Sequence, residues 1–202
     1  MTTFYLVRHG KTMWNKEHRM QGWLDSPLSE EGILQAEKLR EHLKDFSFAA
    51  AFCSSSGRAK ETMHILVGDR QLPIHYEDDL REIFLGEWQG KTVEDIMATN
   101  RFDYEIYKNY PAQYVATHTE SFGAVTERAM FTLKKIAQQY HDDNVLIVSH
   151  SVTIKCILNA ILGQSIAQIW APPFIDGTSV TIIERVEQQW HVKEIGNIHH
   201  LQ

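Results

Sequence analysis

Three apolar segments of this chain each run directly into polar residues of the kind that bind anions and carry out nucleophilic chemistry. The segments, with the residues after them, are 4–7 with Arg8, His9 and Gly10; 49–52 with the serine-rich stretch up to Arg58; and 145–148 with Ser149 and His150. Short apolar runs of this composition indicate buried β-strands. In open α/β sheets, ligands bind outside the carboxyl ends of the strands. We therefore expect two histidines and two arginines to meet at one site.

Helical patterns lie between these strands. We expect helices over 29–45, 57–67, 120–140 and 152–162, a further strand over 72–76, and a closing hairpin of 178–185 and 190–195 with its turn at 187–189. Ser29 is a good N-cap, and the two glutamates after it suit the positive end of a helix dipole. Alternating strands and helices predict an α/β fold, a three-layer α/β/α sandwich with a mostly parallel central sheet.

One stretch, at about 92–119, departs from this alternation. It is rich in tyrosines and polar residues, has a proline in its middle, and shows no clean hydrophobic period. We expect it to form a small helical cap over the strand ends. The whole chain, 1–202, is expected to be a single domain carrying this insertion, since no repeat or interdomain linker is visible.

The composition limits the partners and the compartment. A hydrophobic content of 43% and a charged content of 23% are ordinary for a globular protein. A net charge of -6 argues against general binding to nucleic acid or to anionic membranes. Two cysteines, Cys53 and Cys156, make no disulfide framework, and no leader or bilayer-length apolar run is seen. We therefore expect a cytoplasmic protein.

The histidines and arginines at the strand ends favour an anion site over a metal site. Zinc sites usually need three or four ligands, and arginines beside His9 and His150 would repel a cation. Arginine forms bidentate, charge-assisted hydrogen bonds with phosphate and carboxylate groups. Gly10 would let the backbone approach such a ligand closely. The positive charge of Arg8 and Arg58 disfavours an imidazolium, so a histidine here stays neutral and nucleophilic.

Attack on a phosphate ester also needs a proton for the departing alkoxide. Two glutamates, Glu82 and Glu87, lie among apolar residues and glycines in the segment 80–90. Such surroundings suit a general acid. The residue chemistry alone does not choose between the two.

Taken together, the motifs closely resemble the histidine phosphatase superfamily, the phosphoglycerate mutase-like group with an arginine–histidine–glycine motif. The matching residues occur in family order and span almost the whole chain: Arg8 to Thr12, Asn15, Gln21 to Ser29, Gly32, Ser54 to Ala59, Thr62, and Val148 to His150. A lone arginine–histidine–glycine would mean little, whereas this full set is highly specific.

The resemblance implies a role for each site residue. His9 would be the nucleophile that becomes phosphorylated, and Glu82 aligns with the family's proton donor. The phosphoryl oxygens would be bound by Arg8, Arg58 and His150, with Asn15, Gln21, Gly22 and the backbone at Gly10 and Ser151 nearby. Most of the catalysis would come from electrostatic stabilisation of those oxygens.

The residues after Glu82 point to the phosphatase branch of the family, which includes α-ribazole phosphatases. Cofactor-dependent mutases have arginine, histidine, tyrosine and glycine there, whereas this chain continues with Ile83 and Phe84. Two departures from the family pattern are Ser151 and Thr119, where glycine is usual. A side chain at Ser151 would crowd the pocket.

The expected function is therefore hydrolysis of small phosphorylated metabolites through a phosphohistidine, without metal or other cofactor. A homodimer is the one protein assembly we expect, and no nucleic acid or membrane partner. The alternatives are a phosphoglycerate mutase, which would return the phosphoryl group to its substrate, and a catalytically silent phosphate-binding module. Neither the substrate nor the breadth of specificity can be derived from the sequence.

Overall fold

The central sheet has six strands in the order β3-β2-β4-β1-β5-β6. The computed structural model describes residues 1–202, and its strands are β1 (Thr2–Arg8), β2 (Ala50–Ser54), β3 (Ile74–Glu77), β4 (Asn144–Ser149), β5 (Val180–Val186) and β6 (Gln189–Asn197). The first four strands in this order pair in parallel, and β5 and β6 form an antiparallel hairpin. Both turn residues of the hairpin, Glu187 and Gln188, have positive φ, which matches the twist of the flanking strands. The predicted, mostly parallel sheet is confirmed.

The register of the sheet brings the functional segments together. Arg8 at the end of β1 pairs with Ser149 of β4, and Cys53 of β2 pairs with Val148 of the same strand. Since β4 lies between the other two, the residues after all three strands emerge side by side at one edge. Strand order and register thus explain why the residues after these three strands meet at one site, as expected from the sequence.

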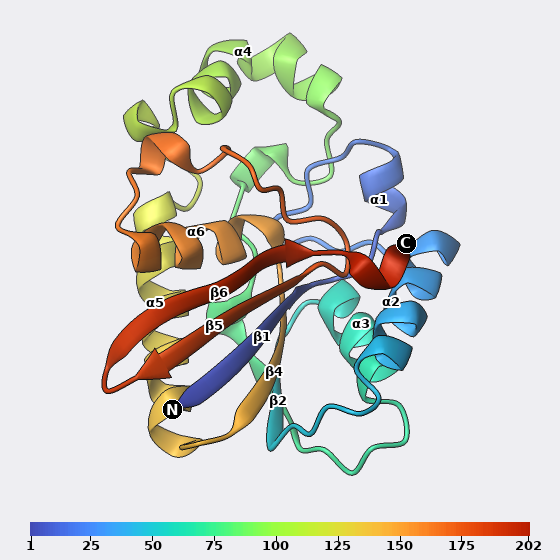
Figure 1. Cartoon of the computed structure of the whole chain (residues 1–202). Helices are drawn as coiled ribbons and strands as arrows, with labels where there is room; N and C mark the ends of the chain where they lie inside the picture. Colours follow the sequence, from blue (N-terminus) through green and yellow to red (C-terminus); the bar gives the residue numbers. More distant parts are fainter.

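Helices cover both faces of the sheet. They are α1 (Met13–Lys16), α2 (Glu30–His42), α3 (Gly57–Val67), α4 (Val93–Asn109), α5 (Phe122–Gln139) and α6 (Ser151–Leu162). Figure 1 shows α2 and α3 on one side of the sheet and α5 and α6 on the other. The three-layer sandwich is confirmed. Ser29 caps α2 as expected, but the helix ends at His42, three residues before the predicted end.

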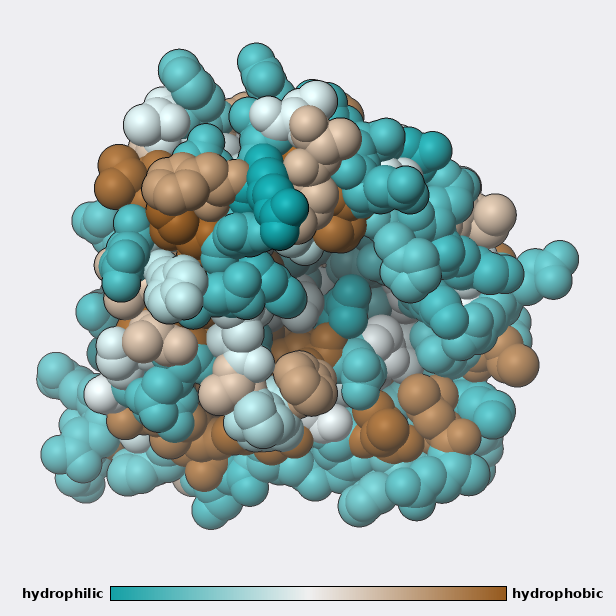
Figure 2. Space-filling view, turned by 90° about the horizontal axis from the view of Figure 1, so that it is seen from above, coloured by the Kyte–Doolittle hydropathy of each residue, from teal (hydrophilic) through white to brown (hydrophobic).

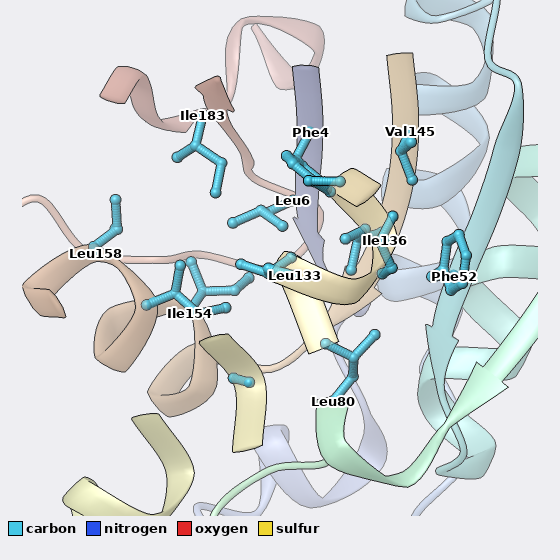
Figure 3. Packing of buried hydrophobic residues seen from close by; sticks show 14 of the residues in the cluster. Phe4, Leu6, Phe52, Leu80, Leu133, Ile136, Val145, Ile154, Leu158 and Ile183 are labelled. Atoms are coloured by element: carbon cyan, nitrogen blue, oxygen red, sulfur yellow. The ribbon is translucent and has the colours of Figure 1, made fainter. Parts of the chain in front are cut away.

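Apolar side chains alternate between the two faces of β1 and so build two cores. Phe4 and Leu6 pack with Leu133 of α5 and Ile154 of α6 (Figure 3). Val7 packs with the helices on the opposite face, through residues such as Leu39 and Met63. A strand buried on both faces has a continuous apolar sequence, which is why the sequence revealed it.

The segment 92–119 is more regular than its sequence suggests. Its main element is the helix α4, which is interrupted by a kink at Asn100. Thr92 and Asp95 form a capping box at its start, a signal the sequence carried. The kink changes the phase of the apolar residues, so one helical period does not span the segment. Figure 1 shows α4 beyond the carboxyl ends of β1 and β4, and its Ile96 and Tyr107 enter a third apolar cluster with Phe122 of α5.

No helix of the chain is both long enough and apolar enough to cross a membrane.

Candidate active site

A cavity of about 300 Å³ lies where the strands β1, β2 and β4 end, beneath α4. Figure 2 views the molecule from the side of α4 and shows a hollow in this face. Eight of the site residues expected from the sequence line the cavity: Arg8, His9, Asn15, Gln21, Gly22, Arg58, Glu82 and Ser151. Gly10 and His150 lie behind this wall. The volume is at the lower end of the range usual for small-molecule sites, about 300–1,000 Å³.

His9 is held as a neutral imidazole with one nitrogen directed at Arg58. Its Nδ1 lies 2.8 Å from the carbonyl oxygen of Gly10, and Nε of Arg58 donates to its Nε2 at 3.2 Å. A carbonyl only accepts and a guanidinium only donates, so the proton is on Nδ1 and the lone pair is on Nε2. Burial, together with the charges of Arg58 and Arg8, sets the pKa of His9 well below 6.5. The ring is therefore a nucleophile without prior deprotonation.

Gly10 orients this ring and does not face the cavity. Its amide donates to Oγ1 of Thr62 at 3.0 Å, and its carbonyl is the acceptor for His9. A Cβ at Gly10 would lie 2.6 Å from the carbonyl oxygen of Gly32 at the start of α2. The absence of a side chain thus permits close packing against a helix. The close approach to a ligand that the sequence suggested at Gly10 stays a prediction.

Arg58 is the most fully bonded side chain of the site and is only 1% exposed. Each of its five N–H groups has an acceptor: His9 Nε2 at 3.2 Å, the Leu24 carbonyl at 2.8 Å, Asp25 Oδ1 at 3.0 Å, the Gly22 carbonyl at 2.8 Å and His150 Nδ1 at 3.1 Å. Asp25 is its counter-ion and also accepts from the amides of Gly57 and Arg58. A buried charge needs such pairing to be tolerated.

His150 contacts Arg58 from behind. It is 0% exposed, accepts from Arg58 through Nδ1, and lies 2.7 Å from Oγ of Ser54 through Nε2. Burial, then Arg58 and His9, holds its pKa well below 6.5. In this arrangement His150 fixes the guanidinium, and its ring does not line the cavity. Ser54 was part of the matched motif, but the sequence indicated no role for it.

Two polar atoms of residues in the cavity wall are left without protein partners. Nε of Arg8 and Oε1 of Gln21 are buried and unbonded, although Arg8 Nη1 donates to the Ile175 carbonyl at 2.7 Å. The side chain of Asn15, which also lines the cavity, accepts from the amide and the hydroxyl of Thr12 through Oδ1. Unsatisfied buried groups are rare in native proteins and call for a ligand or water.

The structure separates the two candidate proton donors. Glu82 lines the cavity, and its carboxyl oxygens accept from the amides of Ile83 at 3.0 Å and of Val152 and Thr153 at 3.2 Å. The last two amides belong to the first turn of α6, where free N–H groups readily bind acceptors. Glu87 is exposed and lines a different cavity, next to Thr119.

Sequence reasoning missed part of the wall. The additional lining residues are Arg19, Met20, Ile83, Leu85, Tyr104, Tyr107, Lys108, Val152 and Trp170. The tyrosines were assigned to the cap, and Lys108 comes after them on the same helix, so helical spacing could have indicated it. Nothing in the sequence pointed to Trp170. No group of three or more histidine, cysteine, aspartate or glutamate side chains is arranged to hold a metal ion.

The comparisons with known proteins agree with this geometry. Residues 4–198 match the histidine phosphatase superfamily (branch 1). The structure of Bacillus stearothermophilus YhfR superposes with a TM-score of 0.98 over 100% of both chains, at 40% identity. The uncharacterized phosphatase PhoE of Bacillus subtilis is 33% identical over 100% of this chain and 97% of its own.

Adenosylcobalamin/alpha-ribazole phosphatase of Escherichia coli is 30% identical over 82% of each chain. Other relatives are named as phosphatases or as probable phosphoglycerate mutases. The chain belongs to the histidine phosphatase superfamily.

The depressed pKa values predict the state of both histidines in acid. As the pH falls through 6.5, where an ordinary histidine takes up a proton, His9 and His150 should remain neutral in the folded protein, each with a fixed tautomer, because burial and the neighbouring arginines lower the pKa of both rings. Two-dimensional ¹⁵N NMR of the imidazole rings reads this directly. Imidazolium signals from either ring in that pH range would contradict the assignment.

A stability consequence has a definite sign. In the unfolded chain both rings take up a proton near the ordinary pKa of 6.5. As the pH falls below 6.5, the unfolded state therefore binds more protons than the folded state, in which both rings stay neutral. The contribution of these groups to the free energy of unfolding should therefore decrease below pH 6.5, by about 1.4 kcal/mol per ring and pH unit. Urea unfolding of the wild type at several pH values between 7 and 5 measures this slope. A free energy of unfolding that rises as the pH falls would contradict it.

Proposed function

We propose that this protein is a phosphatase that hydrolyses phosphomonoesters of small molecules through a phosphohistidine on His9, without a metal ion. The observation that carries the proposal is the fixed tautomer of His9. Its Nδ1 proton is held by the Gly10 carbonyl, its Nε2 lone pair accepts a hydrogen bond from Nε of Arg58, and the residue lines a cavity together with Arg8 and Arg58. This presents a neutral nucleophile next to two permanent cations.

In the first step, Nε2 of His9 attacks phosphorus, the N–P bond forms and the ester P–O bond breaks. Arg58 Nε, which bonds to Nε2 in the free protein, moves its hydrogen bond to an incoming phosphoryl oxygen. The unbonded Nε of Arg8 and the side-chain amide group of Asn15 supply further hydrogen-bond donors to the phosphoryl oxygens. Glu82 gives its proton to the departing alkoxide.

In the second step, water attacks the phosphohistidine. The Glu82 carboxylate takes a proton from that water, the P–O bond forms, and the N–P bond breaks to return neutral His9 and free phosphate. His150 and Asp25 keep the Arg58 guanidinium in place through both steps, by contacts at 3.1 and 3.0 Å. The charge on the phosphoryl oxygens is thus met by groups that are already oriented.

Product analysis separates a phosphatase from a mutase, the alternative that shares this pocket. We expect steady release of inorganic phosphate from simple alkyl esters, with no bisphosphoglycerate added and no loss of rate after exhaustive chelation. Rapid quenching should trap a phosphoenzyme that is labile to acid and more stable to base. His9→Ala should abolish both turnover and labelling.

Interconversion of the two phosphoglycerates with negligible free phosphate would contradict this proposal and establish the mutase. Substantial turnover by His9→Ala would exclude the phosphohistidine route, and restoration of a chelated enzyme by zinc or manganese would place the chemistry in another class. Absence of any turnover, with phosphate still bound, would leave the phosphate-binding module.

The charges of the cavity favour a substrate with a second anionic group. Arg8, Arg19, Arg58 and Lys108 line it against the single carboxylate of Glu82, in a chain whose net charge is -6. We assign Arg8 and Arg58 to the phosphoryl group, Arg58 together with its counter-ion Asp25, and Arg19 is paired with Glu17. Lys108 has no carboxylate partner, and its Nζ lies 4.7 Å from the centre of the Trp170 ring.

A matched pair of substrates tests this preference. 2-Carboxyethyl phosphate and n-propyl phosphate differ only in the group at the far end of the chain. We expect Lys108→Gln to lower kcat/KM for the first about two- to fivefold, the value of one exposed ion pair, and to leave the second unchanged. Lys134→Gln, which removes the same charge from an exposed position of α5, is the control. Equal effects of Lys108→Gln on both substrates would contradict a role in specificity.

A further inference from the structure

The segment that carries Glu82 has no regular hydrogen-bonding ladder of its own. It continues from β3 as a single 3-10 turn, Asp78–Leu80, and then runs as coil to Leu85. The carbonyl groups of such a segment must be bonded by groups from elsewhere. The groups that bond these carbonyls therefore determine where the Glu82 carboxyl lies.

Arg128 of α5 supplies three of these bonds, whereas Ser149, Thr153 and Trp23 supply one each, to the carbonyls of Leu80, Arg81 and Glu82. All five N–H groups of Arg128 are used: Nη1 donates to the carbonyls of Asp79 at 2.6 Å and Arg81 at 2.7 Å, Nη2 to the carbonyl of Glu82 at 3.1 Å, and Nε and Nη2 to the two carboxyl oxygens of Glu120 at 2.7 and 2.9 Å. One side chain therefore bonds the backbone of the proton donor itself and of two residues before it.

Glu120 bonds the same segment on the other side of Glu82. Its Oε2 accepts from the amide of Phe84 at 3.1 Å, and its own amide donates to the Phe84 carbonyl at 2.8 Å. The carboxyl and guanidinium side chains are each only 15% exposed. Arg128 and Glu120 thus hold the backbone on both sides of Glu82, and we call this pair the acid-loop clamp.

Neither member of the acid-loop clamp lines the cavity. A mostly buried ion pair is weak evidence for stability, because desolvation offsets much of its attraction. The five directed hydrogen bonds of Arg128 instead fix the position of the backbone around Glu82. A planar guanidinium can make these bonds at once, whereas a lysine ammonium cannot. Proton transfer is sensitive to such geometry, and a displacement of about 1 Å can cost ~100-fold in rate.

We propose that Arg128 is a positioning residue, which acts through Glu82 by fixing the backbone that carries it, with Glu120 as its partner. The inference rests on the proposed function, in which Glu82 protonates the leaving group. Arg128 contacts no substrate, so its loss should affect the step that needs Glu82 and leave phosphate binding intact.

Leaving groups of different basicity reveal this role. Propanol leaves n-propyl phosphate as a strongly basic alkoxide that needs a proton, whereas p-nitrophenolate departs without one. Glu82 also serves the hydrolysis of the phosphohistidine, which is common to both substrates, so kcat/KM is compared because it reports only the formation of the phosphoenzyme. Arg128→Lys, which keeps the charge but cannot make the five bonds, should lower kcat/KM for n-propyl phosphate about 10- to 100-fold. For p-nitrophenyl phosphate the decrease in kcat/KM should be no more than about threefold. Glu120→Gln, a second variant of unchanged size, should show the same pattern more weakly.

The double variant links the effect to the proton donor. Glu82→Gln alone should reproduce the leaving-group dependence, and adding Arg128→Lys to it should cause no further change in the ratio of the two kcat/KM values. Arg70→Lys is the control, because Arg70 also donates to a backbone carbonyl, that of Leu43 at 2.6 Å, and does not line the cavity. Its ratio should equal that of the wild type.

Equal losses for both substrates in Arg128→Lys and Glu120→Gln, or effects that multiply with that of Glu82→Gln, would overturn the positioning role. If Glu82→Gln itself shows no leaving-group dependence, the proton donor is wrongly assigned and the inference falls with it. If Glu82→Gln shows the dependence and Arg128→Lys does not, the proposed function stands and the clamp alone is refuted.

Discussion

The buried guanidinium of Arg58 is the interaction on which the site depends. Its five hydrogen bonds join His9, His150, the counter-ion Asp25 and two carbonyls of the loop 22–24. A charge removed from water needs its donors satisfied, so the guanidinium holds these segments in one arrangement. Burial and then the same charge lower the pKa of both histidines. The interaction that fixes the geometry of the site is thus one that keeps His9, the proposed nucleophile, neutral.

The fold supplies this arrangement through strand order, and the proton donor comes from a separate source. Because β4 lies between β1 and β2, His9, Arg58 and His150 come after neighbouring strands. Glu82 reaches the cavity on an irregular segment held by α5 and by the first turn of α6. The proposed nucleophile and the proposed proton donor are therefore positioned by different parts of the molecule, which allows substitutions that disturb one and spare the other.

The sequence was sufficient wherever a residue's role depended on its own segment. The strands, the helices α3 and α6, and the meeting of His9 with Arg58 could be predicted from apolar runs and from the polar residues directly after them. Features that depend on tertiary contacts could not, such as the five bonds of Arg128 or Trp170 in the cavity wall. Gly10 is an example. The sequence indicated that the backbone there approaches a ligand closely, and only the structure shows that α2 packs closely against Gly10.

In the proposed mechanism the Gly10 carbonyl holds the Nδ1 proton of His9 and so makes Nε2 the nucleophile. The position of the phosphoryl group on the trapped phosphoenzyme tests this most directly. Phosphorus NMR of the denatured intermediate, against the two phosphohistidine isomers as standards, distinguishes the nitrogens. The structure predicts phosphorylation of His9 at Nε2 alone. A phosphoryl group on Nδ1, or on any residue other than His9, would contradict the account.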